Sequence, residues 1–110
     1  MFVDRIKDFI VIYGPDCRKR HYHRQTKDKI TEFCLQLEIY HSGKWHGLIR
    51  YGTAHGFSHR DVIHFDGKIE KIPLGTADYN DALTFAQTDI ETNWRRYRDR
   101  FFKEARDENE

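Results

Sequence analysis

The sequence predicts an α+β domain in which a meandering antiparallel sheet of about five or six strands is covered on one face by one long C-terminal helix. Two observations support this fold class. Before residue 73, apolar and polar residues alternate over short segments, and pairs such as Ser42-Gly43 separate the segments as hairpin turns do. After residue 80, apolar residues recur at the three- and four-residue spacings of a helix.

The composition predicts one small domain. The chain has 110 residues, so we expect residues 1–110 to form a single unit around one core. Cys17 and Cys34 do not have the spacing of a zinc site or of a disulfide-rich secreted domain. The sequence also lacks a signal-peptide pattern and an apolar segment of roughly 20 residues. We therefore expect a soluble cytoplasmic protein with no membrane association.

Two strands are expected in the first third of the chain. Residues 9–13 form an uninterrupted β-branched and aromatic run that ends at Gly14-Pro15, which predicts a strand followed by a turn. Residues 18–25 are polar and precede a turn-like segment at 26–29. They predict a second, more polar strand.

The clearest strand pattern lies at residues 31–40, where Phe33, Leu35, Leu37 and Ile39 alternate with Cys34, Gln36, Glu38 and Tyr40. One face of this strand should be buried and the other should be polar. Ser42-Gly43 predicts a two-residue hairpin loop, with residues 44–51 returning as the antiparallel partner. We expect Glu38, Tyr40 and some of the histidines to lie on the sheet face away from the helix.

A second hairpin is predicted further along the chain. Residues 61–65 read as a strand, Asp66-Gly67 as a type I′ turn, and residues 68–72 as the returning strand. Pro73 then indicates an edge of the sheet.

The last third predicts a helix over residues 80–105, capped by Asp78 or Asn80. Its apolar stripe consists of Leu83, Ala86, Ile90, Trp94, Tyr97 and Phe101. Residues 106–110 are acidic and lack an apolar anchor, so we expect this tail to fray.

The segment 50–64 carries the densest group of ionisable side chains and is the candidate catalytic site. Its candidate residues are Arg50, Tyr51, His55, His59, Arg60 and Asp61. One hypothesis is metal-free RNA cleavage at the 2′-hydroxyl, with His55 or His59 removing the proton. The other histidine or Tyr51 would return a proton, and Arg50 or Arg60 would hold the phosphate.

Two alternatives for this segment stay open. His55, His59 and His64 with Asp61 are competent metal ligands, but their spacing matches no zinc or iron motif, so we predict no metal and no other cofactor. The same side chains could instead be structural in a non-catalytic protein-interaction or nucleic-acid-binding module, for example through an ion pair of Asp61 with Arg60 or Arg50. Motifs of phosphate-binding loops, zinc proteases and serine esterases are absent from the sequence.

A basic segment near the N-terminus is a candidate nucleic-acid interface. Cationic and aromatic side chains alternate there, and the candidate residues are Arg18, Lys19, Arg20, Tyr22, Arg24 and Lys27. Such side chains can contact phosphates and stack on a base. The alternative is a solvated hairpin rich in charge.

The motif at residues 50–56, Arg-Tyr-Gly-Thr-Ala-His-Gly, followed by His-Arg-Asp at 59–61, resembles a set of small uncharacterised bacterial and archaeal proteins with an R-Y-D-x-A-H-G…H-R-D core. This resemblance extends over residues 35–101, whereas residues 48–65 are also distantly similar to the TumE family of toxins. The toxin resemblance implies an RNA-directed toxin with a cognate antitoxin or other protein partner; a homodimer is a further expectation. Gly52 stands where both patterns have an acid, so Asp61 would have to substitute for it or the activity would be lost.

Overall fold

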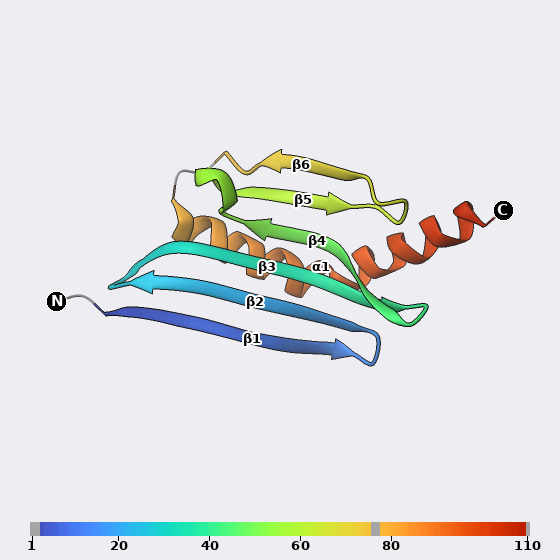
Figure 1. Ribbon diagram of the computed structural model, residues 1–110, viewed down its shortest axis with the longest axis horizontal. Helices are drawn as coiled ribbons and strands as arrows, with labels where there is room; N and C mark the ends of the chain where they lie inside the picture. The colour runs from blue at the N-terminus through green and yellow to red at the C-terminus, as the bar shows by residue number, and fades with distance from the viewer. Residues whose placement is uncertain (1–2, 76–77, 110) are drawn as a thin grey trace.

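The computed structural model describes residues 3–75 and 78–109, apart from the side chain of His55. Six strands form one antiparallel sheet in chain order, and a single long helix follows them (Figure 1). The elements are β1 (Asp4–Gly14), β2 (Cys17–Thr26), β3 (Lys29–His41), β4 (Lys44–Gly52), β5 (His59–Ile63), β6 (Ile69–Pro73) and α1 (Tyr79–Glu108), with a short 3₁₀ helix, η1 (Ala54–Gly56), between β4 and β5. The predicted α+β meander is confirmed.

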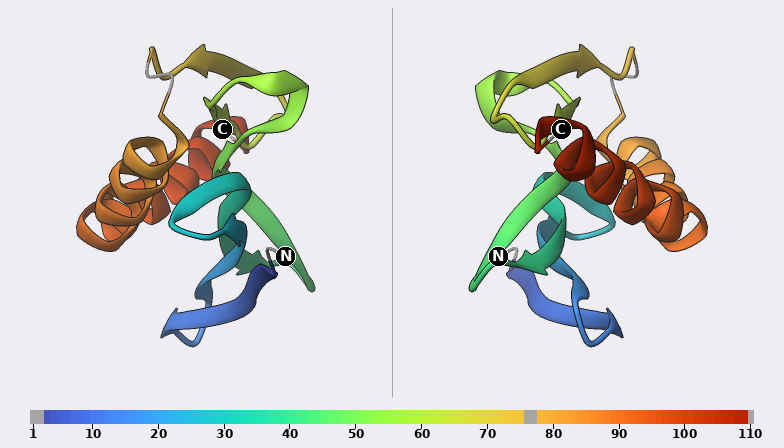
Figure 2. Two further views of the ribbon diagram at one scale, coloured as in Figure 1. Left: turned by 90° about the vertical axis from the view of Figure 1, so that its left-hand side faces the viewer. Right: turned by 90° about the vertical axis from the view of Figure 1, so that its right-hand side faces the viewer.

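The helix lies on one face of the sheet, across β3 and β4. Figure 2 shows α1 on one side of the twisted sheet, with the β1–β2 hairpin extending beyond it. We call the face that α1 does not cover the open face. Among the described residues, no helix combines the length and apolar composition needed to cross a bilayer.

The core lies between α1 and the central strands, as the alternation at residues 31–40 predicts. Its buried side chains include Phe33, Leu35, Leu37 and Ile39 of β3, Ile49 and Tyr51 of β4, and Leu83, Ala86, Ile90, Tyr97 and Phe101 of α1. Trp94 of the predicted stripe is only partly buried, and its ring stacks on Tyr13 of β1 at 5.2 Å between ring centroids.

One of the two predicted hairpin turns has a different form. Ser42 and Gly43 have φ values of 52° and 83°, as a two-residue type I′ loop requires. At the other turn only Gly67 has a positive φ, 90°, so the type I′ prediction was wrong. The N–H of Gly67 donates to the C=O of His64 at 2.9 Å, which makes a three-residue loop. The carboxylate of Asp66 accepts the N–H of Lys68 at 2.9 Å and stabilises this form.

Strand β1 is longer than the apolar run that predicts it. It starts at Asp4 instead of residue 9, because the antiparallel ladder with β2 continues to the pair Asp4–Thr26. The hydroxyl of Thr26 donates to the Asp4 carboxylate at 2.6 Å. Ladder pairing therefore extends the strand through polar residues that the apolar pattern leaves out.

The helix begins where the sequence predicts and ends later. The Asp78 side chain accepts the N–H of Asn80 at 2.8 Å, which confirms the predicted cap. The predicted fraying of residues 106–108 was wrong, since α1 continues to Glu108. Lys103 pairs with Asp107 at 3.0 Å, and the Asn109 side chain donates to the C=O of Ala105 at 3.0 Å. Residue 110 lies outside the described residues.

Candidate functional site

An ion pair between Arg50 and Asp61 occupies the open face where β4 and β5 are directly paired. Arg50 donates through Nε and Nη2 to Oδ2 of Asp61, at 3.0 and 2.7 Å. Asp61 is fully buried, and Nζ of Lys71 on β6 lies 3.4 Å from its Oδ1. Burial alone raises the pKa of Asp61, but the hydrogen bonds and charge of Arg50, aided by Lys71, lower the pKa below its ordinary value. Asp61 is therefore an anion that fixes the position of the Arg50 guanidinium.

His59 lies beside this ion pair at the start of β5. Its side chain is almost completely buried, and its Nε2 is 3.9 Å from Oδ1 of Asp61. In the β4–β5 ladder His59 is opposite Gly52. A Cβ atom at Gly52 would lie 3.9 Å from Nε2 and 3.8 Å from Cε1 of the ring. A side chain at position 52 would thus be in van der Waals contact with the imidazole.

Two adjoining depressions in the open face bring these residues together with β2, and we call them the open-face groove. They have volumes of about 300 and 400 Å³ and share Tyr22, Cys34 and Arg50. The first is lined by Asp8, Arg20, His21, Tyr22, Cys34, Gln36 and Arg50. The second is lined by Tyr22, Thr31, Glu32, Phe33, Cys34, Arg50, Gly52, Thr53, Ala54, Gly56, His59 and Tyr79.

The structure divides the predicted basic segment between the two faces of β2. Of its residues, Arg18, Arg20, Tyr22 and Arg24 alternate with Lys19, His21 and His23 along the strand. Lys19 is buried on the helix side, and Lys27 lies in the β2–β3 turn with φ 57°.

The arginines of β2 differ in their ion pairs. Arg18 pairs with Glu38 at 2.7 Å, and Arg24 lies 3.4 Å from Glu32. Among the described residues Arg20 has no acidic partner, and its side chain is exposed at the groove. Arg20 is therefore the cation of this segment that is available to a ligand.

Tyr51 and Arg60 lie on the opposite face from Arg50, His59 and Asp61. The Tyr51 hydroxyl donates to Oδ2 of Asp89 on α1 at 2.6 Å, and burial together with this bond raises the pKa of Tyr51 far above its ordinary value. The pKa of Arg60 is raised, chiefly by its interaction with the Tyr51 side chain. The candidate catalytic residues therefore form two separate sets on opposite faces of the sheet.

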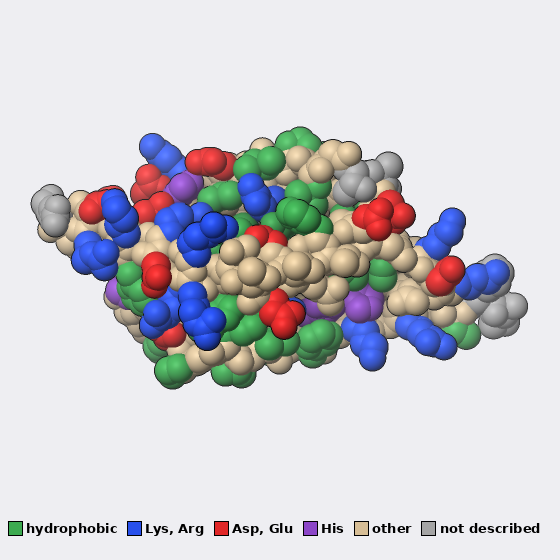
Figure 3. Space-filling model, turned by 180° about the vertical axis from the view of Figure 1, so that it is seen from behind, with side chains coloured by type: hydrophobic (Ala, Val, Ile, Leu, Met, Phe, Trp, Pro, Cys, Tyr) green, Lys and Arg blue, Asp and Glu red, His purple; other side chains and the backbone are tan. Residues whose placement is uncertain are grey.

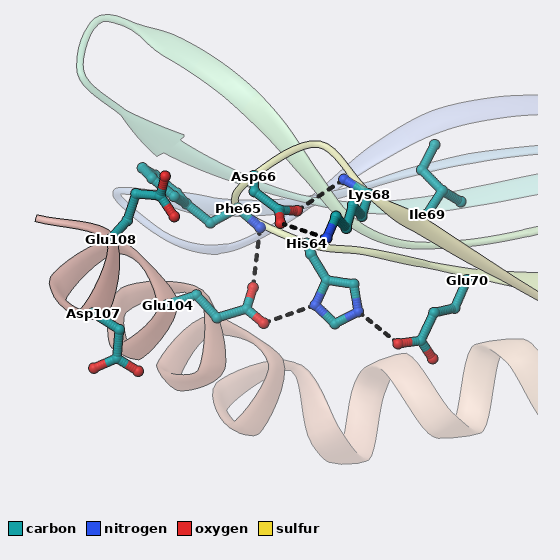
Figure 4. Close-up of a pocket in the computed structure, with 9 residues that line it drawn as sticks. All are labelled: His64, Phe65, Asp66, Lys68, Ile69, Glu70, Glu104, Asp107 and Glu108. Carbon is teal, nitrogen blue, oxygen red and sulfur yellow. Dashed lines mark hydrogen bonds and ion pairs between the residues drawn. The ribbon is translucent and has the colours of Figure 1, made fainter.

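The remaining histidines of the segment are not grouped with His59. The backbone places His55 in η1, between Ala54 and Gly56 at the rim of the groove. His64 lies in a different depression, where its Nδ1 is 2.8 Å from Glu104 and its Nε2 is 2.9 Å from Glu70 (Figure 4). Hydrogen bonds with these two carboxylates raise the pKa of His64. Among the described side chains, no three His, Cys, Asp or Glu residues converge as metal ligands do.

Sequence reasoning missed Lys71 and the groove contribution of Gln36. Lys71 is opposite Asp61 in the β5–β6 ladder. The predicted two-residue turn at 66–67 would have placed Ile72 opposite Asp61, and the three-residue loop shifts the register by one residue to Lys71. Gln36 is opposite Arg50 in the β3–β4 ladder. The alternation at residues 31–40 places Gln36 on the open face but does not indicate a groove.

A protein-family model matches almost the whole chain. Residues 4–107 match the family model of a domain of unknown function, DUF7718. No curated protein and no solved structure matches the chain. The similarity of residues 48–65 to TumE toxins stays a prediction.

Proposed function

The chain belongs to the DUF7718 family, and we propose that it binds single-stranded RNA in the open-face groove. One observation carries this proposal: the guanidinium of Arg50 is fixed by the buried Asp61 and lines the same depression as Arg20, which has no acidic partner among the described residues. Two guanidinium groups that face one depression provide a ready site for a phosphate.

The hydrogen bonds of Arg50 leave part of its guanidinium for a ligand. Nε and Nη2 both donate to Asp61, so Nη1 has two N–H groups outside this pair. Because Asp61 holds the side chain in place, little side-chain entropy is lost when Arg50 binds an anion. Burial raises the pKa of the Cys34 thiol, which lines the groove, and the charges of Arg50 and Arg20 both oppose this rise. This common effect supports the view that their charges act on the same small volume.

Tyr22 supplies an aromatic surface at the junction of the two depressions. Its hydroxyl donates to Glu32 at 2.5 Å, which restricts the orientation of the ring. A positioned ring beside arginines suits an unstacked base next to its phosphate, and such bases are accessible in single strands and not in duplexes. The resemblance to RNA-directed proteins at residues 48–65 favours RNA over DNA.

We expect Arg20→Ala to weaken binding of a short fluorescent single-stranded RNA by about tenfold at low salt. The slope of log affinity against log salt concentration should decrease by the amount that corresponds to about one phosphate contact. Arg5→Ala is the matched control, because Arg5 is exposed on β1 and has no acidic partner among the described residues. It should change the affinity less than about twofold. Fluorescence anisotropy across a salt series measures both. Equal losses in the two variants, or no binding at low salt, would contradict the proposal.

A second candidate function is cleavage of the bound RNA by His59. The observation that favours it is that His59 and Arg50 line the same depression, with Gly52 directly opposite His59. An imidazole in this position can exchange a proton with a ribose hydroxyl, while Arg50 stabilises the charge that develops on the phosphate. No metal ion takes part in this proposal.

Cleavage predicts that the protein degrades RNA in the presence of a chelator and that His59→Ala abolishes degradation while RNA binding persists. Gly52→Asp offers a sharper test, because its Cβ would meet only ordinary van der Waals contacts and its carboxylate would lie near His59. It should move the acidic limb of the pH–rate profile to higher pH, since a nearby anion raises the pKa of a histidine that acts as the base. Gly52→Asn has the same shape without the charge and should not move it. RNA that stays intact under all conditions would reject cleavage and leave the binding proposal standing.

Given the resemblance to TumE toxins, RNA cleavage by this protein should also affect the growth of cells that express it. A toxin of this kind would slow growth when expressed alone, and a protein antitoxin would relieve this by covering the open face. We expect induced wild-type protein to arrest growth and His59→Ala to be tolerated. Equal growth with both proteins at matched expression would remove the toxin role.

A further inference from the structure

Strand β1 forms an unusually long and apolar edge of the sheet. It has 11 residues and is paired only with β2 among the described elements. Phe9, Ile10 and Ile12 are 42%, 50% and 68% exposed, and they belong to an uncharged run from Phe9 to Tyr13. Figure 3 shows hydrophobic side chains along the lower margin of the molecule, where β1 lies in Figure 1.

The two edges of the sheet differ in how they are protected from pairing. Strand β6 has five residues, carries Glu70 and Lys71 and ends in Pro73, and all three are features that discourage edge-to-edge contact. Strand β1 has charges only in its first half, and its bulge lies at the far end, between Ile12 and Gly14. The segment from Phe9 to Ile12 therefore offers unpaired backbone groups flanked by apolar side chains on both faces of the sheet.

We propose that β1 pairs antiparallel with β1 of a second copy of this chain. A two-fold axis normal to the sheet keeps each side chain on its own face of the sheet. Odd-numbered residues of β1 therefore lie opposite odd-numbered residues of the second copy, and even-numbered residues opposite even-numbered ones. With the axis at Phe9, Phe9 meets its own copy and Ile6 meets Ile12. With the axis at Ile10, Ile10 meets its own copy and Phe9 meets Val11.

The charges of β1 disfavour registers that are centred earlier in the strand. An axis at Lys7 or Asp8 would place two like charges directly opposite each other, which destabilises strand pairing. An axis at Phe9 or Ile10 instead places Asp8 opposite an isoleucine, Ile10 or Ile12. The same sequence thus supplies both halves of an apolar contact, which is the reason for assigning a second copy as the partner.

Analytical ultracentrifugation of Ile10→Glu and Ile69→Glu tests the proposal with a matched pair. Both isoleucines are 50% exposed, and they lie on opposite edges of the sheet, so neither change should unfold the protomer. We expect the wild type and Ile69→Glu to form dimers at tens of micromolar concentration. Ile10→Glu places a new carboxylate opposite Asp8 or its own copy and should weaken the dimer by at least about tenfold. Thermal melting confirms that each variant is folded.

Three results would overturn the proposal: a monomeric wild type at about 200 μM, a dimer that Ile10→Glu leaves unchanged, or a dimer that Ile69→Glu disrupts equally. Hydrogen exchange adds an independent measurement. Amides of residues 6–12 should become more protected as the wild-type concentration rises, whereas amides of β6 should not. Protection gained in β6 instead would also reject the β1 interface. The RNA-binding proposal does not depend on any of these outcomes.

Discussion

Replacing Asp61 with Ala is expected to lower the free energy of unfolding by about 2–3 kcal/mol, because it removes one partner of a buried ion pair. Asp61 is fully buried and receives two hydrogen bonds from Arg50, with Lys71 close by. Without the carboxylate, Arg50 and Lys71 would lose the anion that lies between them. Arg50 is partly solvated, so rehydration should keep the loss at or below the lower end of the range for buried pairs.

Chemical denaturation measures this loss, and Arg24→Ala is the control. Arg24 lies 3.4 Å from Glu32, but both side chains are more than 40% exposed, so this change should cost less than about 1 kcal/mol. Asp61→Ala should also weaken RNA binding, since Arg50 would no longer be held at the groove. A stability loss no larger than that of Arg24→Ala would show that Asp61 does not organise the site.

The Asp61 contribution also has a defined pH dependence. Its pKa in the folded protein is lowered from an ordinary value of 3.8, so the ionised form favours the folded state. The stabilisation is fully present above pH 3.8 and is lost as the pH falls through the lower pKa of the folded protein. The difference in stability between the wild type and Asp61→Asn should therefore shrink with acid. A constant difference between about pH 6 and about pH 2 would contradict the lowered pKa.

Replacing Asp89 with Ala is expected to cost about 3 kcal/mol of stability, because several groups share this one carboxylate. The hydroxyls of Tyr51 and Tyr97 donate to Oδ2 at 2.6 and 2.7 Å, and the Asn93 side chain donates to Oδ1 at 2.8 Å. Both tyrosines are buried, so their hydroxyls would lose their acceptor in a place that water does not reach easily.

Asn93→Ala is the matched control for Asp89→Ala. It removes one hydrogen bond to the same carboxylate and leaves both tyrosine hydroxyls satisfied, so we expect a loss of about 1 kcal/mol. Thermal and chemical unfolding of the two variants give the comparison. Similar losses would mean that the tyrosine hydrogen bonds contribute little to stability. Asp89 would then stabilise the protein mainly through its bond to Asn93 within α1.

Much of the fold could be predicted because its signals are local. The alternation at residues 31–40 and the three- and four-residue spacing after residue 80 each report which side of an element is buried. The two errors concern side-chain contacts that these patterns do not contain. Asp66 accepts a backbone N–H and favours a three-residue loop, and Lys103 pairs with Asp107 to extend the helix beyond its apolar stripe.

The candidate site was only partly predictable. Adjacent residues of a strand point to opposite faces, so the alternation could have separated Arg50 from Tyr51 and Asp61 from Arg60. Grouping the ionisable residues of 50–64 into one candidate site did not take this alternation into account. In the structure β4 precedes η1 and β5 follows it. Arg50 is opposite Asp61 and Tyr51 is opposite Arg60 in the ladder between these two strands.

The amino-acid sequence by itself determined the order of the strands, the helix and its cap, and the face of each element that is buried, because these depend on neighbours within a few residues. Only the tertiary structure decided which charges meet. Arg20 and Arg50 line one depression although they come from strands separated by β3, and Tyr51 binds an aspartate 38 residues away. Such contacts depend on strand register and on the docking of α1, which are properties of the whole sheet and not of any single segment.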